Sequence, residues 1–159
     1  MSEPATLHLR FEKQQSDSTI LRVRQQDPPW RVVRGFPTPS GELLVHIHNV
    51  SCGVLDGDSL TCRIEVGPFA QAQVTTTGAT RVYRSRSPRH TAAHTAKVTV
   101  CDGAYLEYVP DQLIPFAGSR LRQSVSIELR PQASLIWWER VACGREASGE
   151  VFQYESLAS

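Results

Sequence analysis

Apolar and polar residues alternate along most of this chain. Residues 60–66 alternate without a fault, and the same pattern recurs in residues 19–24, 96–100 and 125–129. Successive side chains of a β-strand point to opposite faces of its sheet. The alternation therefore predicts strands with one buried face and one face in water.

Residues 43–48 and 134–138 are more continuously apolar, which predicts strands covered on both sides. Turn-forming residues separate the runs, and Gly67-Pro68 and Asp102-Gly103 each stand where a hairpin or a tight corner is expected. No window of about eleven residues or more has the apolar spacing of a helix. The pattern predicts an all-β chain of short strands in one domain, residues 1–159.

The composition narrows the class of protein. Apolar residues make up 40% and charged residues 21% of the 159 residues, which is typical of a folded domain with a core and excludes a disordered tail. No apolar run approaches the roughly 20 residues that span a bilayer. The first residues lack the basic and apolar regions of a secretory signal, so we expect a cytoplasmic protein with no membrane partner.

The charges and the cysteines exclude two further classes. With 17 basic and 16 acidic residues, no global field attracts nucleic acid. Four cysteines lie far apart with no C-x-x-C pair, which excludes a zinc ribbon and predicts reduced, mostly buried thiols. A basic cluster over residues 81–90 has Tyr83 as its only aromatic residue, whereas single-strand binders interleave several, so we expect no nucleic-acid partner.

Acidic and hydroxyl side chains gather in four loop segments. Residues 51–58 form a glycine-containing turn that carries Asp56 and Asp58 and is suited to a metal or proton site or to a solvated corner. Residues 75–85 are rich in hydroxyls, residues 106–118 place Glu107 and Asp111 between prolines, and residues 144–150 end on Glu150. Each acid could serve chemistry or hold the fold.

A pair of histidines offers a different reading. His46 and His48 lie on one face of the expected strand 43–48, which is a start for a metal site. A metal-dependent β-barrel enzyme of the cupin kind would need a Glu a few residues later, where this chain has Cys52 and Gly53. No nucleophile elbow, Walker loop, dinucleotide fingerprint or HExxH motif is present.

Taken together and in order, the segments 51–58, 75–85, 110–118 and 144–150 resemble the UreD (UreH) family of urease accessory proteins. The similarity runs from about Leu7 to Glu150. The resemblance implies an elongated stack of short strands, β-helix-like or sandwich-like, with few or no helices. It also implies a protein that is not an enzyme.

The resemblance further implies a set of partners and a cargo. Proteins of this family bind apo-urease and, through UreF, recruit the nickel-carrying GTPase UreG. They are thought to offer nickel an internal, water-filled path to the nascent urease site. We therefore expect a urease maturation scaffold with nickel in transit and no tightly bound cofactor, and the cupin-like enzyme remains the alternative.

By position in the family motifs, the resemblance places a nickel path at six residues. Weakly held oxygen ligands suit an ion that must be released, and carboxylates and hydroxyls supply them. No resident metal ligand can be assigned. The six residues are Asp58, Thr80, Tyr83, Glu107, Asp111 and Glu150.

The chain departs from the family pattern in two ways. Cys52 and Asp56 replace two glycines of the glycine-rich loop, and Asp111 stands one position before the usual acid. Family members also continue well past the motif that ends at Glu150, so we expect a chain truncated at its C-terminus. A truncated stack would expose an unpaired strand edge, and we expect poor solubility from it.

Overall fold

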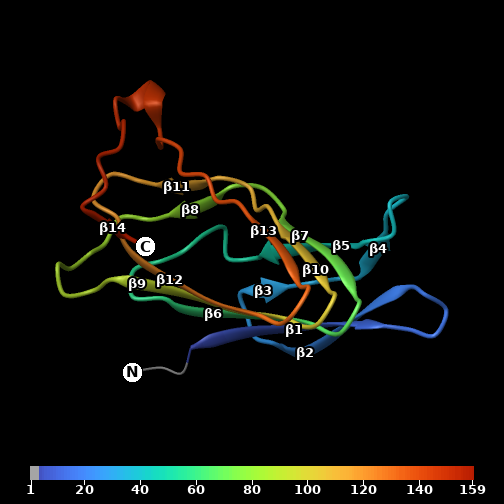
Figure 1. Ribbon diagram of the computed structural model, residues 1–159. Helices are drawn as coiled ribbons and strands as arrows, with labels where there is room; N and C mark the ends of the chain where they lie inside the picture. The colour runs from blue at the N-terminus through green and yellow to red at the C-terminus, as the bar shows by residue number, and fades with distance from the viewer. Residues whose placement is uncertain (1–3) are drawn as a thin grey trace.

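The computed structural model describes residues 4–159 and confirms the all-β prediction. It contains fourteen strands, and one short 3-10 turn, η1 (Glu146–Ser148), lies in a loop that projects from the sheets (Figure 1). None of the helical segments within residues 4–159 has the length and apolar character needed to cross a membrane.

The strands form two large sheets and one small one. The first sheet has, in spatial order, β14 (Ser156–Ala158), β12 (Arg120–Leu129), β9 (Ala92–Val100), β6 (Ser59–Val66), β1 (Ala5–Lys13) and β2 (Thr19–Gln26). The second has β13 (Ser134–Trp137), β10 (Tyr105–Tyr108), β7 (Gln71–Thr76), β5 (Leu43–Asn49) and β3 (Trp30–Arg31), with β4 (Gly35–Pro37) also paired to β5. The small sheet pairs β11 (Leu113–Pro115) with β8 (Thr80–Val82).

The chain winds repeatedly around these three sheets. It passes from the second sheet through the small sheet to the first and back again, and the strands stacked in this way are parallel. Successive turns begin at Leu43, Gln71, Tyr105 and Ser134, so each turn takes about 30 residues. This is the elongated, β-helix-like stack that the resemblance implied (Figure 1).

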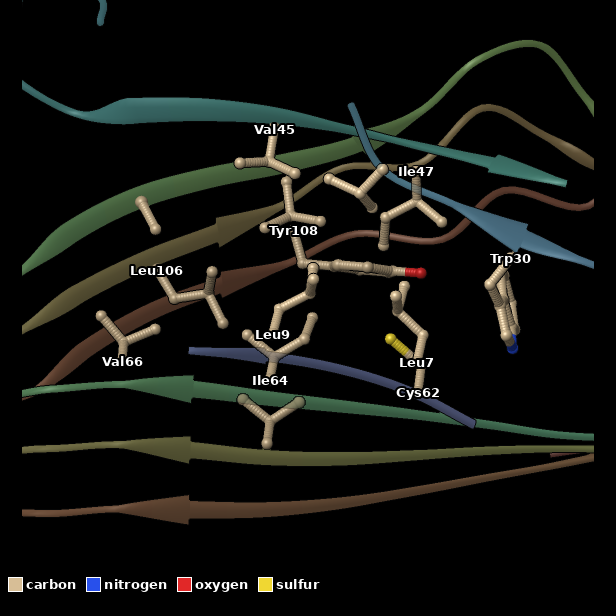
Figure 2. Packing of buried hydrophobic residues seen from close by; sticks show 14 of the residues in the cluster. Leu7, Leu9, Trp30, Val45, Ile47, Cys62, Ile64, Val66, Leu106 and Tyr108 are labelled. Atoms are coloured by element: carbon tan, nitrogen blue, oxygen red, sulfur yellow. The ribbon is translucent and has the colours of Figure 1, made fainter. Parts of the chain in front are cut away.

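In-register apolar side chains fill the space between the two large sheets. Leu9, Ile64 and Val98 stand in one row across the first sheet, and each is buried. Val74 and Tyr108 form a facing row on the second sheet. Figure 2 shows Leu9 and Ile64 of the first sheet and Tyr108 of the second meeting between the sheets, which is where burial of apolar surface stabilises the fold.

The two predicted turns are corners. Gly67-Pro68 carries the chain from β6 in the first sheet to β7 in the second, and Asp102-Gly103 carries it from β9 to β10 in the same way. The hairpin alternative is wrong because a hairpin joins neighbouring strands of one sheet, whereas each of these turns joins facing sheets.

One end of the stack is open. Only Arg120–Arg122 of β12 pair with β14, so the rest of that strand has no outer neighbour among the described residues. The apolar side chains of Val125, Ile127 and Leu129 are therefore 40%, 43% and 50% exposed. The expectation that residues 125–129 bury one face is wrong for this reason. Residues 134–138 are likewise not covered on both sides, since Ile136 and Trp138 are exposed.

The cysteines are unpaired, but they are less buried than predicted. Cys62 is buried in the core, Cys101 and Cys143 are half-buried, and Cys52 is exposed on its loop. The sequence prediction of mostly buried thiols is wrong because three of the four lie on corners or loops rather than on inward strand positions.

Candidate functional site

A cavity of about 200 Å³ lies where the three sheets enclose the interior of the stack. Leu60, His94 and Gln123 line it from the first sheet, and Tyr108 lines it from the second. The cavity reaches solvent at a rim formed by three exposed residues, Arg81, Glu139 and Arg140. A space of this size, in a wall that is mostly apolar but carries several polar groups, has room for several water molecules.

His94 is a buried polar residue in the lining of this cavity. It stands in register with Leu60 on β6 and with Gln123 on β12, so all three side chains point inward. Its Nε2 atom is enclosed and has no hydrogen-bond partner, and its ring lies 5.8 Å from that of Trp30. Burial lowers the pKa of His94 to about 4, which keeps the imidazole neutral at pH 7.

Cys62 and Tyr108 also line the cavity from opposite sheets. Burial raises the pKa of the Cys62 thiol to about 12. Burial, with smaller contributions from Cys62 and Glu139, raises the pKa of the Tyr108 hydroxyl. Both groups are therefore protonated at neutral pH. In Figure 2 the Tyr108 ring lies between the sheets with its hydroxyl directed to the side where Trp30 stands.

The structure brings two of the six predicted path residues, Thr80 and Asp111, together at the cavity. The Asp111 carboxylate accepts a hydrogen bond from the backbone N–H of Gly78 (2.8 Å), and its own backbone N–H donates to Thr76 Oγ1 (2.9 Å). The backbone N–H of Thr80 donates to the carbonyl of Gln112 (2.9 Å). These bonds tie the hydroxyl-rich segment to the proline loop and fix the cavity wall.

Asp58 and Tyr83 lie in neighbouring loops and do not line the cavity. The Asp58 carboxylate accepts the backbone N–H of Leu55 (2.8 Å) and so closes its own turn. The Tyr83 hydroxyl donates to the Cys52 carbonyl (3.4 Å), and its ring meets Phe116 edge-on. Both contacts hold loops in place.

Glu107 and Glu150 are further removed from the cavity lining. Glu107 is on the outward-facing side of β10, where it accepts hydrogen bonds from the Tyr105 hydroxyl (3.0 Å) and from Gln73 Nε2 (3.4 Å). Glu150 pairs with Arg145 (3.0 Å) near η1. The six predicted residues therefore do not form one cluster.

Asp56, one of the departures from the family pattern, has a structural role. Its carboxylate accepts hydrogen bonds from the Ser85 hydroxyl (2.6 Å) and the backbone N–H of Arg86 (3.1 Å), and it contacts His90 Nδ1 (3.2 Å). The bond from Ser85, the largest cause, lowers the pKa of Asp56. This carboxylate joins the glycine-rich loop to the arginine-rich one.

The two histidines of the cupin-like alternative lie on the outer face of β5. His46 meets the ring of Phe36 edge-on, and His48 Nε2 is 3.5 Å from Thr77 Oγ1. Within residues 4–159, no group of three or more His, Cys, Asp or Glu side chains is arranged to hold a metal ion. The stack of parallel turns also differs from a cupin barrel.

Sequence reasoning assigned no role in a site to the inward groups of the cavity, His94, Cys62, Tyr108 and Gln123. The signal for His94 was nevertheless present. Ala96, Val98 and Val100 alternate inward along one strand, and extending this alternation backwards puts His94 on the same face. No sequence signal could show that His94 lies beside Gln123, because this pairing joins strands from separate turns of the stack.

Comparison with known proteins identifies the family. A family model described as UreD urease accessory protein matches residues 3–159. A protein of Herpetosiphon aurantiacus named urease accessory protein UreD is 46% identical over 139 residues, which cover 87% of this chain and 48% of that protein. Proteins with the same name from a Nostoc species and from Cenarchaeum symbiosum are 38% and 35% identical over 86% and 97% of this chain. The chain spans about half the length of these relatives and belongs to the UreD family of urease accessory proteins.

Proposed function

We propose that this protein is a urease maturation factor that binds apo-urease and, together with UreF and with UreG bound through UreF, helps to deliver nickel to the urease active site. It acts in the cytoplasm as a scaffold and catalyses no reaction of its own. The observation that carries the proposal is the family match over residues 3–159.

The geometry supports the passage of a metal ion through the interior. The cavity of about 200 Å³ opens at a rim that includes Asp111, Glu139 and the Thr80 segment beside Arg81 and Arg140, so an ion would meet oxygen ligands between two positive charges. Oxygen ligands hold a borderline metal such as nickel less firmly than thiolates do. A path lined in this way suits a cargo that must be released.

The binding part of the proposal is tested by co-expressing tagged residues 1–159 with the apo-urease subunits, with and without UreF, and by measuring capture on the tag. We expect urease to be captured and UreF to increase or stabilise the complex. A folded chain that captures neither protein, while the Herpetosiphon relative captures both, would overturn the proposal for this chain.

The path is tested with two matched carboxylate variants in the assembled activation system. Asp111→Asn alters an acid at the cavity, whereas Glu107→Gln alters one on the outward-facing side of β10. If nickel passes through the cavity, Asp111→Asn slows urease activation several-fold and Glu107→Gln does not. Equal slowing by both variants would instead favour the wider path that includes Glu107, Asp58, Tyr83 and Glu150.

A further inference from the structure

The cavity brings a nitrogen and a sulfur ligand from neighbouring strands to one enclosed space. His94 on β9 is in register with Leu60 on β6, and Cys62 follows Leu60 on the same inward face. Strands about 4.8 Å apart with a rise of about 3.3 Å per residue put the His94 and Cys62 Cα atoms about 8 Å apart. Imidazole and thiol side chains can span this separation through one metal ion.

The unpartnered imidazole is the second, independent observation. A buried polar atom without a hydrogen bond costs roughly 1–3 kcal/mol, so folded proteins rarely keep one without a reason. The enclosed Nε2 of His94 is such an atom, and its ring lines the cavity rather than the packed core. Gln123 and Tyr108 are further polar groups of the inner wall, and Asp111, Glu139, Arg81 and Arg140 add charged groups to the lining.

We propose that the cavity is a staging site for one divalent ion of the nickel type, ligated by the His94 imidazole and the Cys62 sulfur, with water in the other positions. On binding, the Cys62 S–H bond breaks, a metal–sulfur bond forms, and the proton passes to cavity water. The Cys62 thiolate makes this the point of the path where the ion is held most firmly, but two protein ligands still hold it less firmly than a closed three- or four-ligand site would, which allows it to move on. The identity of the cargo rests on the proposed function.

The site is tested by titrating the purified chain with Ni²⁺ alone and following the sulfur-to-nickel charge-transfer absorption. We expect one ion per chain, loss of the absorption in Cys62→Ser, and at least tenfold weaker binding in His94→Gln. His46→Gln and Cys101→Ser are matched controls, because they alter an imidazole on the outer face and a half-buried thiol at a corner. Both variants should bind Ni²⁺ with an affinity within twofold of that of the unmodified chain.

Cys52 supplies a discriminating variant, since its exposed thiol lies at the cavity lining near the surface. If Cys52→Ser abolishes the absorption and Cys62→Ser keeps it, the ion sits at the rim and the staging site is wrong. Unchanged affinity in His94→Gln would also overturn the proposal.

Inward variants can fail to fold, so a second measurement uses the unmodified chain. Mass spectrometry follows the alkylation of each cysteine by a small reagent with and without Ni²⁺. We expect nickel to slow alkylation of Cys62 at least tenfold relative to that of Cys101. Equal rates with and without nickel would contradict the site.

The failure of this site and the failure of the maturation role can be told apart. Capture of apo-urease is measured without nickel, and His94→Gln should capture as much as the unmodified chain. Nickel binding at His94 and Cys62 without capture would leave the site standing and overturn the maturation role. Capture of apo-urease without nickel binding in the cavity would leave the maturation role standing and overturn the site.

Discussion

His94 occupies an inward position of β9, where other inward side chains, those of Ala92, Ala96 and Val98, are apolar. The fold holds this imidazole in the cavity with its Nε2 unpartnered and its pKa lowered to about 4 by burial. A neutral imidazole offers a nitrogen lone pair to a metal ion or a hydrogen-bond donor at physiological pH, which an imidazolium cannot do. The same burial makes the stability of the fold depend on pH.

His94→Gln should remove part of the acid sensitivity of the protein. The unfolded chain takes up a proton on His94 at about pH 6.5, whereas the folded chain does so only near pH 4, so folding stability falls as the pH drops through this window. The loss is on the order of 3 kcal/mol. Urea midpoints measured between these pH values should decline less steeply in the variant. An identical decline in both proteins would contradict the burial of His94.

Asp56 shows the opposite case of a carboxylate stabilised in its charged form. The pKa of Asp56 is lowered, chiefly by the hydrogen bond from Ser85, so its contribution to stability is present above the usual aspartate pKa and is lost as the pH falls through the lowered value. Asp56→Asn should lower the melting temperature at pH 7, and the difference from the unmodified chain should shrink below about pH 4. Asp102→Asn, on an exposed corner, should melt like the unmodified chain at every pH.

At the scale of elements, the tight loops decide how closely successive turns of the stack can approach one another. Gly53 has φ of 150°, and a Cβ built there would lie 2.5 Å from the Arg81 carbonyl oxygen. Only a glycine lets this loop reach the small sheet, where Val54 bridges Val82. The backbone, rather than any side chain, makes this contact.

Gly53→Ala should therefore be markedly destabilising. Gly57→Ala is a matched control, because Gly57 also has positive φ (78°) but no atom within 4 Å of the added Cβ. We expect the Gly53 variant to lose well over 1 kcal/mol, and to lose more than the Gly57 variant, whose cost is the strain of positive φ alone. Equal losses in denaturant unfolding would show that the approach to Arg81 costs nothing.

The positions of the strands were predicted from the sequence more accurately than the burial of their side chains. Alternation placed β6, β9 and β12 correctly, because the period of two is a local property of extended backbone. It failed for the burial of Val125, Ile127 and Leu129, since burial depends on whether another strand covers them. No local pattern reports the presence of such a neighbour.

For residues 4–159 as a whole, the open end exposes apolar side chains beside a strand edge that has no described partner beyond Arg122. Val125, Ile127 and Leu129 on β12 are exposed at this end, and the inward residues of the last strand of the second sheet, Leu135 and Trp137, are only half-buried. Exposed apolar edges promote pairing with other chains. This surface accounts physically for the expected low solubility.

Ile127→Lys should reduce self-association of residues 1–159. A charge on the inward-facing row of the open end opposes contact between two such ends, and Ile127 is already 43% exposed in the single chain. Light scattering after gel filtration should show a larger monomer fraction. Ser126→Lys, which places the same charge on the opposite face of the same strand, should change it much less. A fully monomeric, reversibly melting unmodified chain would contradict the premise.

The candidate site was predictable only in part. Thr80 and Asp111 came from family motifs and line the cavity, whereas Asp58, Tyr83, Glu107 and Glu150 came from the same reasoning and lie outside its lining. Motif positions fix order along the chain. The orientation of a side chain toward the interior or the solvent depends on its parity in a strand, which turns Glu107 of β10 outward and which loop residues such as Asp58 lack.

The alternation of side chains, the corner residues and the four motifs were enough to establish an all-β chain of the UreD family, because each of these signals is local or follows chain order. The tertiary structure alone decided which strands stack, that His94, Cys62 and Tyr108 share one cavity, and that Val125, Ile127 and Leu129 are left exposed by the strands described in residues 4–159. These features join residues from separate turns of the stack. Their positions are set by inter-strand register, which the sequence of any single strand does not specify.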